Sequence, residues 1–172
     1  MSDQDHIRIT IISTGGTIEK SYCEVGGDLS NRDGILDSMI SQLELPGIRV
    51  HHRAVLNKDS LDMTDEDREL IVKAVGEAVS ESDGILVVHG TDRLAETGER
   101  LHEVYGDVSP PVVLTGAMRP YELRRTDALQ NLTESLMALR LLTSGIWCVM
   151  HNEALRFPGV RKDRELMRFV QA

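Results

Sequence analysis

The 172-residue chain is poor in aromatic residues and in cysteine. Aromatics make up 3% of it, which argues against a stacking platform for single-stranded nucleic acid. Its two cysteines, Cys23 and Cys148, lie far apart without CxxC spacing, which favours a reducing compartment over a disulfide framework. No apolar run approaches the length of a membrane span, and the first residues lack the features of a secretory signal. We therefore expect a cytoplasmic protein with no membrane contact.

Basic residues are fewer than acidic ones, 19 against 28, which gives a net charge of −9. This balance repels phosphate backbones, and no Lys/Arg cluster compensates for it, so a nucleic-acid partner is not expected. Hydrophobic residues at 41% and charged residues at 27% are ordinary for a globular chain of this length. The partners we expect are a small-molecule substrate and further copies of the same chain.

Short apolar runs alternate with longer helical patterns along the chain. The runs that predict strands are residues 7–13, 48–56, 84–89, 111–115 and 145–150. The patterns that predict helices are residues 35–43, 64–79, 93–105 and 125–142, and a glycine-marked loop is expected over residues 18–31. Such alternation predicts an α/β fold with a mostly parallel sheet flanked by helices.

Two regions differ in character. Residues 1–150 contain all the predicted strands and helices and are expected to form one α/β domain. Residues 151–172 are charged and follow no clear period, so they are expected to be a tail or arm. Such an arm could complete the active site, reach a neighbouring subunit or be partly disordered.

Three loops at predicted strand ends place hydroxyl groups beside glycines. They are residues 14–18 (Thr-Gly-Gly-Thr-Ile), 89–92 (His-Gly-Thr-Asp) and 115–120 (Thr-Gly-Ala-Met-Arg-Pro). In a parallel α/β sheet, ligands bind beyond the carboxyl ends of the strands. Each loop alone is more typical of a turn or helix cap than of a catalytic group. Their recurrence at successive strand ends favours a shared site.

The residue types in these loops suit acyl transfer. A threonine hydroxyl becomes a nucleophile when a base takes its proton, and glycines let the backbone approach a ligand closely. Asp92 can bind an ammonium group, and Lys162 can take part in proton transfer. The six histidines show no ligand spacing beside acids or cysteines, so no metal is expected. His89 follows a buried strand and is expected to be structural.

Together, residues 14–18, 88–92 and 114–120 resemble the signatures of bacterial-type L-asparaginases in order, spacing and strand context. The resemblance covers essentially the whole chain, but only the amino-terminal domain of the usual two-domain members. The chain is thus similar to the short, single-domain asparaginases. The resemblance implies an amidohydrolase that converts L-asparagine to L-aspartate and ammonia through a threonine acyl-enzyme, with no cofactor.

The resemblance also implies catalytic roles for matching residues. Thr14 would attack the side-chain amide carbon, and Tyr22 would assist its proton transfer. Thr91 and Lys162 would activate a water, and Asp92 would bind the substrate amino group.

Substrate contacts are implied in the same way. Ser60 would hold the substrate carboxylate, and Gly15 and Gly90 lie beside the reacting groups. Thr17 lies close enough to Thr14 that an exchange of their roles stays open.

The chain also departs from the family pattern. Leu61 stands where many larger members have glutamine, and Arg93 stands where threonine often follows the Thr-Asp pair. The resemblance implies sites near subunit contacts, so we expect a homo-oligomer, either a dimer or a tetramer. Since the match lacks the carboxy-terminal domain, the alternative is a non-catalytic amino-acid-binding or regulatory module. Activity on glutamine also stays open.

Overall fold

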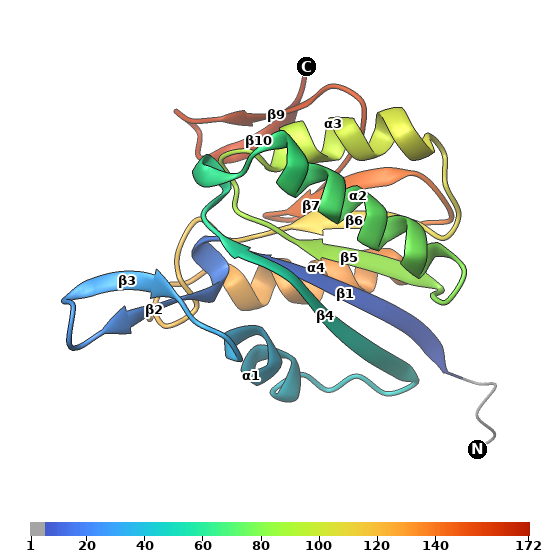
Figure 1. Cartoon of the computed structure of the whole chain (residues 1–172). Coiled ribbons are helices and arrows are strands. Elements are labelled where there is room, and N and C mark those ends of the chain that lie inside the picture. Colours follow the sequence, from blue (N-terminus) through green and yellow to red (C-terminus); the bar gives the residue numbers. More distant parts are fainter. Residues whose placement is uncertain (1–5) are drawn as a thin grey trace.

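A six-stranded sheet forms the centre of the computed structural model, which describes residues 6–172 (Figure 1). Its strand order is β4-β1-β5-β6-β7-β8. The strands are β1 (Ile7–Gly15), β4 (Ile48–Lys58), β5 (Gly84–Val88), β6 (Val112–Thr115), β7 (Ile146–Met150) and β8 (Glu153–Arg156). The first five run parallel, and β8 returns antiparallel to β7. The predicted α/β class with a mostly parallel sheet is confirmed.

Helices cover both faces of the sheet (Figure 1). They are α1 (Ile35–Ser41) and α4 (Ala128–Leu141) on one face, and α2 (Asp65–Val79) and α3 (Leu94–Tyr105) on the other. Helix α2 begins at the predicted residue, because Thr64 and Asp67 form a reciprocal capping box. Among the described residues, no helix is long and apolar enough to cross a membrane.

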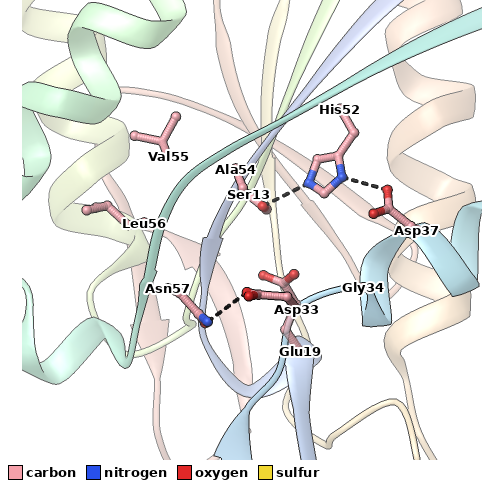
Figure 2. A pocket seen from close by; sticks show the side chains of 10 residues that line it. All are labelled: Ser13, Glu19, Asp33, Gly34, Asp37, His52, Ala54, Val55, Leu56 and Asn57. Carbon is pink, nitrogen blue, oxygen red and sulfur yellow. Dashed lines mark hydrogen bonds and ion pairs between the residues drawn. The ribbon is translucent and has the colours of Figure 1, made fainter.

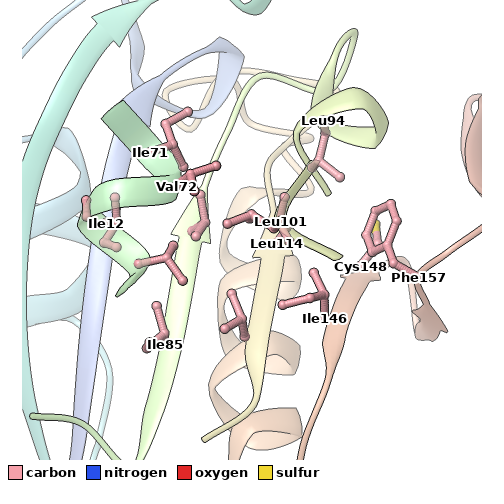
Figure 3. Close-up of a cluster of buried hydrophobic side chains, with 14 of the residues drawn as sticks. Ile12, Ile71, Val72, Ile85, Leu94, Leu101, Leu114, Ile146, Cys148 and Phe157 are labelled. Atoms are coloured by element: carbon pink, nitrogen blue, oxygen red, sulfur yellow. The ribbon is translucent and has the colours of Figure 1, made fainter. Parts of the chain in front are cut away.

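Alternating side chains of the central strands supply both halves of the core. Ile85 and Val87 of β5 point toward α2 and α3, while Leu86 and Val88 point toward α1 and α4. Figure 3 shows the first of these clusters, which contains Phe157 and Cys148 together with apolar side chains of the central strands and of α2 and α3. A strand that is buried on both faces reads as a continuous apolar run, and β5 does so.

The loop expected over residues 18–31 is instead a short 3₁₀ turn, η2 (Thr17–Glu19), followed by an antiparallel hairpin. The hairpin strands are β2 (Lys20–Cys23) and β3 (Asp28–Asn31). Contacts from distant loops hold the hairpin: Ser21 Oγ and the Tyr22 amide both donate to the carboxylate of Glu122. Since those partners lie about a hundred residues away in sequence, the local pattern does not predict the hairpin.

Residues beyond Met150 form β8 and a second hairpin, β9 (Val160–Asp163) and β10 (Arg168–Gln171). Their apolar side chains are part of the core: Phe157, Val160 and Phe169 are all buried. Phe157 packs on Gly98 of α3, where any Cβ would come within 2.0 Å of the ring. This packing carries β9 back over the carboxyl ends of the parallel strands.

Asp127 fixes the loop that follows β6. Its carboxylate is 2% exposed and accepts hydrogen bonds from the amides of Met118 (2.9 Å) and Arg119 (3.0 Å). His151 Nε2 lies 2.7 Å from the same carboxylate. Burial acts to raise the pKa of Asp127, but these hydrogen bonds outweigh it and hold the pKa below its ordinary value.

We expect Asp127→Ala to lower the free energy of unfolding at pH 7 by about 3 kcal/mol, because it leaves buried donors unpaired. A depressed carboxyl pKa contributes stability that is present above the unfolded-state pKa and lost as pH falls through the folded-state pKa. The difference from wild type, measured by urea unfolding, should therefore shrink below about pH 4. A difference that stays constant from pH 7 to pH 3 would contradict this role.

Candidate active site

The carboxyl ends of β1 and β5 bring two of the predicted loops into direct contact. A Cβ on Gly16 would lie 2.5 Å from Gly90 Cα, and a Cβ on Gly90 would lie 2.6 Å from Ser60 Oγ. Gly16 also has a φ of 86°, which side-chain-bearing residues rarely adopt. Only glycine therefore fits where these loops cross, and Ser60 at the start of η3 (Ser60–Asp62) packs against them.

A cavity of about 400 Å³ opens beside this crossing. Its lining comes from four separate segments of the chain: η2, the loop after β5, the loop after β6 and the β9–β10 hairpin. The lining residues are Thr17, Thr91, Asp92, Met118, Lys162, Arg164 and Met167. Three of the five predicted catalytic residues are therefore brought together here.

Lys162 makes the central contacts of this cavity. Its Nζ donates to Thr91 Oγ1 at 2.8 Å and to Asp92 Oδ1 at 3.0 Å. Only 11% of the Lys162 side chain is exposed, and Thr91 is buried. Because Thr91 Oγ1 accepts from Lys162, its own O–H is directed elsewhere and is available to a water or a substrate. Lys162, which the family resemblance implied, thus contacts both Thr91 and Asp92.

Thr14 and Thr17 have different surroundings. Thr14 is fully buried, and its Oγ1 donates to the main-chain carbonyl of Val88 at 3.0 Å. Thr17 is half-buried and lines the cavity with Thr91 and Lys162. The geometry gives Thr14 a structural hydrogen bond and favours Thr17, the alternative that the sequence left open, as the hydroxyl available to a substrate.

The amides of the two glycines between these threonines are already paired. The Gly15 amide donates to Glu19 Oε2 at 3.1 Å, and the Gly16 amide donates to the Lys58 carbonyl at 3.0 Å. Burial raises the pKa of Glu19, and the hydrogen bond from Gly15 partly offsets that effect. The predicted contact between Gly15 and a substrate is therefore not one that its amide can make in this arrangement.

Neither Ser60 nor Tyr22 is among the residues that line the cavity. Ser60 is buried, and its hydroxyl has no hydrogen-bond partner among the described residues. An unpaired buried hydroxyl is costly, so a ligand that accepted its hydrogen bond would gain from it. Tyr22 is 54% exposed on β2 and lies outside the cavity lining.

His89 has the structural role expected of it. Its ring is fully buried, with Nδ1 2.8 Å from the Gly90 carbonyl and Nε2 2.9 Å from Thr97 Oγ1. Burial lowers the pKa of His89 to about 4, so the ring is neutral at pH 7. Within residues 6–172, no group of three or more His, Cys, Asp or Glu side chains could hold a metal ion.

Two lining residues, Arg164 and Met167, were missed by sequence reasoning. No sequence signal identified Arg164, because it lies beyond the end of β9, in the turn between β9 and β10. The turn presents both residues to the cavity, and it was not predicted.

A second cavity, of about 450 Å³, lies between α1 and the edge strand β4 (Figure 2). His52 connects Ser13 and Asp37 there, with Nε2 2.9 Å from Ser13 Oγ and Nδ1 2.6 Å from Asp37 Oδ1. The serine–histidine–aspartate order is that of a hydrolytic triad. Ser13, however, is buried in β1, which pairs with β4 on one side and β5 on the other. None of the predicted site residues lines this cavity.

Comparison with known proteins identifies the family of this chain. Residues 8–166 match the family model described as Asparaginase, N-terminal. The L-asparaginase of Thermococcus kodakarensis is 34% identical over 161 residues, which cover 93% of this chain and 49% of that protein. The chain belongs to the asparaginase family. The predicted family resemblance is confirmed.

Solved asparaginase structures share the fold. The structure of the thermostable L-asparaginase from Thermococcus kodakarensis superposes with a TM-score of 0.85 at 32% identity, over 96% of this chain and 51% of that one. A further relative, a glutamyl-tRNA(Gln) amidotransferase subunit from Methanococcus vannielii, is 29% identical over 84% of this chain and 34% of that protein. The chain thus spans about half the length, or less, of these relatives.

Proposed function

We propose that this chain is an amidohydrolase that cleaves the side-chain amide of L-asparagine to L-aspartate and ammonia, with Thr17 as the nucleophile. The observation that carries the proposal is the cavity that Thr17 shares with the hydrogen-bonded group of Lys162, Thr91 and Asp92. Membership of the asparaginase family supports amide hydrolysis as the reaction type.

In the first half of the reaction, Thr17 Oγ1 attacks the amide carbon. The C–N bond breaks, the hydroxyl proton passes to the leaving nitrogen, and ammonia departs from an ester between Thr17 and the acyl group. Thr14 supports this step indirectly, because its bond to the Val88 carbonyl ties the end of β1 to β5.

In the second half, a water attacks the ester carbon. The Thr91 hydroxyl orients the water, since its oxygen accepts from Lys162 and its O–H is free to point into the cavity. The water passes a proton to the hydrogen-bonded pair of Thr91 and Lys162, and this pair returns a proton to the Thr17 oxygen as the ester C–O bond breaks and the carboxylic acid leaves. Asp92 holds Lys162 in position through the second hydrogen bond of Nζ. The sum is one amide and one water converted to one acid and one ammonia.

The experiment is ammonia release from L-asparagine by the full chain, with L-glutamine as the second substrate. We expect ammonia and L-aspartate in equal amounts from asparagine, and none above background from a Thr17→Val control. L-Aspartate binding without any turnover would instead support the alternative of a non-catalytic amino-acid-binding or regulatory module. This alternative is considered because the chain spans only about half the length of the asparaginases that it matches.

A further inference from the structure

Glu19 is a buried acidic residue beside the candidate site that the mechanism above does not use. It is 6% exposed, and it belongs to η2, the same 3₁₀ turn that carries Thr17. Thr17 lines the cavity with Lys162, whereas Glu19 lines the second cavity with His52 (Figure 2). Burying a carboxyl group is unfavourable unless it forms hydrogen bonds, so the place of Glu19 needs an explanation.

A hydrogen bond to Glu19 spans Thr17. The Gly15 amide donates to Glu19 Oε2 at 3.1 Å, so the bond closes a ring around residues 16–18. A main-chain bond narrows the same turn, because the Glu19 amide donates to the Gly16 carbonyl at 3.2 Å. Glu19 therefore fixes the chain both before and after Thr17.

Neighbouring loops anchor Glu19 itself. Its main-chain carbonyl accepts from the Arg32 amide at 3.1 Å, directly after β3. The next residue, Lys20, donates to Asp59 Oδ2 at 2.6 Å, which ties the turn to the segment before η3. A group that supports a reactive side chain must itself be held in place, and these contacts meet that condition.

The Gly15 amide depends on this acceptor. Gly15 is buried and tightly enclosed, since a Cβ there would lie 2.6 Å from the Lys58 nitrogen and 2.8 Å from Asn31 Nδ2. Without the Glu19 carboxyl group, a buried donor would lose its partner, which favours a rearrangement of the turn. In so short a turn, a rearrangement moves the Thr17 hydroxyl.

We propose that Glu19 is a positioning residue for the reaction: its carboxyl group holds the turn of residues 15–19 and thereby sets the place of the Thr17 hydroxyl. Glu19 lies outside the lining of the catalytic cavity, so it acts through the Gly15 amide and not on the substrate. The inference rests on the proposed function for its effect on turnover. Its effect on the Gly15 amide can be measured without any activity.

The test compares Glu19→Met with Glu19→Gln. Both replacements keep the length of the side chain, but only glutamine has an amide oxygen that can accept from Gly15. In Glu19→Met, we expect kcat for L-asparagine to fall about 10²-fold per folded molecule, the cost of misplacing a reacting group by about 1 Å, with KM within about threefold. Glu19→Gln should keep kcat within about fivefold of wild type, because a neutral acceptor is weaker than a carboxylate.

Amide hydrogen exchange, followed by NMR, reports on the hydrogen bond itself. The Gly15 amide should exchange about tenfold or more faster in Glu19→Met than in wild type, the effect of losing one hydrogen bond. Amides of β5 and β6 are the internal reference, because they report the overall opening of the fold. Glu19→Gln should return the Gly15 rate toward that of wild type.

Ser82→Ala is the matched control. Ser82 Oγ and Thr10 Oγ1 form a buried hydrogen bond of 2.6 Å just before β5 begins, at the opposite end of that strand from the site. The variant loses one buried hydrogen bond, as Glu19→Met does. Its kcat and its Gly15 exchange rate should stay within about twofold of wild type, because distant sites contribute independently.

Four results would overturn the inference. They are unchanged Gly15 exchange in Glu19→Met, wild-type kcat in that variant, a Glu19→Gln variant no faster than Glu19→Met, and an equal fall of kcat in Ser82→Ala. A fifth result separates the two proposals. If wild type releases no ammonia while Gly15 exchange follows the expected pattern, the hydrolase proposal fails and the role of Glu19 in holding the turn stands.

Discussion

Thr17→Val is expected to lower kcat by several orders of magnitude while the chain stays folded. Valine keeps the branched shape of threonine but has no hydroxyl, so the acyl-enzyme cannot form. Thr17 is half-buried and lines the cavity, so the change removes no core contact. The measurement is steady-state ammonia release, compared with urea unfolding of the same variant.

Thr14→Val is the matched comparison, because it makes the same chemical change three residues earlier. It leaves the Val88 carbonyl without its buried donor, so the free energy of unfolding should fall by about 1–3 kcal/mol. Thr14→Ser keeps the hydroxyl and should be close to wild type. Turnover per folded molecule should survive in both Thr14 variants. Loss of turnover in Thr14→Val with retention in Thr17→Val would reverse the assignment.

Lys162→Met is expected to slow the reaction by about 10² to 10⁴, the usual effect of removing a positioned proton-transfer group. The loss should fall on the second half of the reaction, because Lys162 contacts Thr91 and not Thr17. A first turnover would then release ammonia rapidly, and later turnovers would be slow. Rapid-quench measurement of ammonia against time separates the two phases.

Lys162→Arg provides the control for charge. An arginine keeps the ion pair with Asp92, but it does not give up its proton near neutral pH. This variant should fold like wild type and still be slow after the first turnover. A Lys162→Arg enzyme with wild-type kcat would show that Lys162 supplies only charge, and the proton-transfer role would be wrong.

The central sheet was predictable because its strands are buried on both faces. Runs such as Ile85–Val88 are apolar without interruption, and capped helices such as α2 begin at recognisable residues. The two hairpins were not predictable in this way. β2–β3 depends on Glu122, and the residues before β9 depend on the room that Gly98 leaves for Phe157. Both contacts join segments that are distant in sequence.

The choice between Thr14 and Thr17 shows the same limit at the site. The motif places a threonine on each side of two glycines, and the sequence alone does not decide which threonine hydroxyl faces a ligand. The backbone decides it: Gly15 and Gly16 have φ values of 93° and 86°. These torsions turn the chain between the two threonines, so that Thr14 points into the core and Thr17 lines the cavity.

The grouping of Thr91, Asp92 and Lys162 was predicted through the family resemblance, and the structure brings the three side chains together. Arg164 could not be found that way, because the motifs assign it no role. Its position follows from the β9–β10 turn, which only the structure reveals.

The most direct test of Thr17 as the nucleophile is to locate the covalent intermediate. The Lys162→Met variant should be mixed with L-asparagine, quenched in acid within the first turnover and examined by intact mass and by peptide digestion. The proposed mechanism predicts a species heavier by one aspartyl group, with the added mass on Thr17. Added mass on Thr14 or Thr91, or rapid ammonia release with no covalent species at any time, would contradict it.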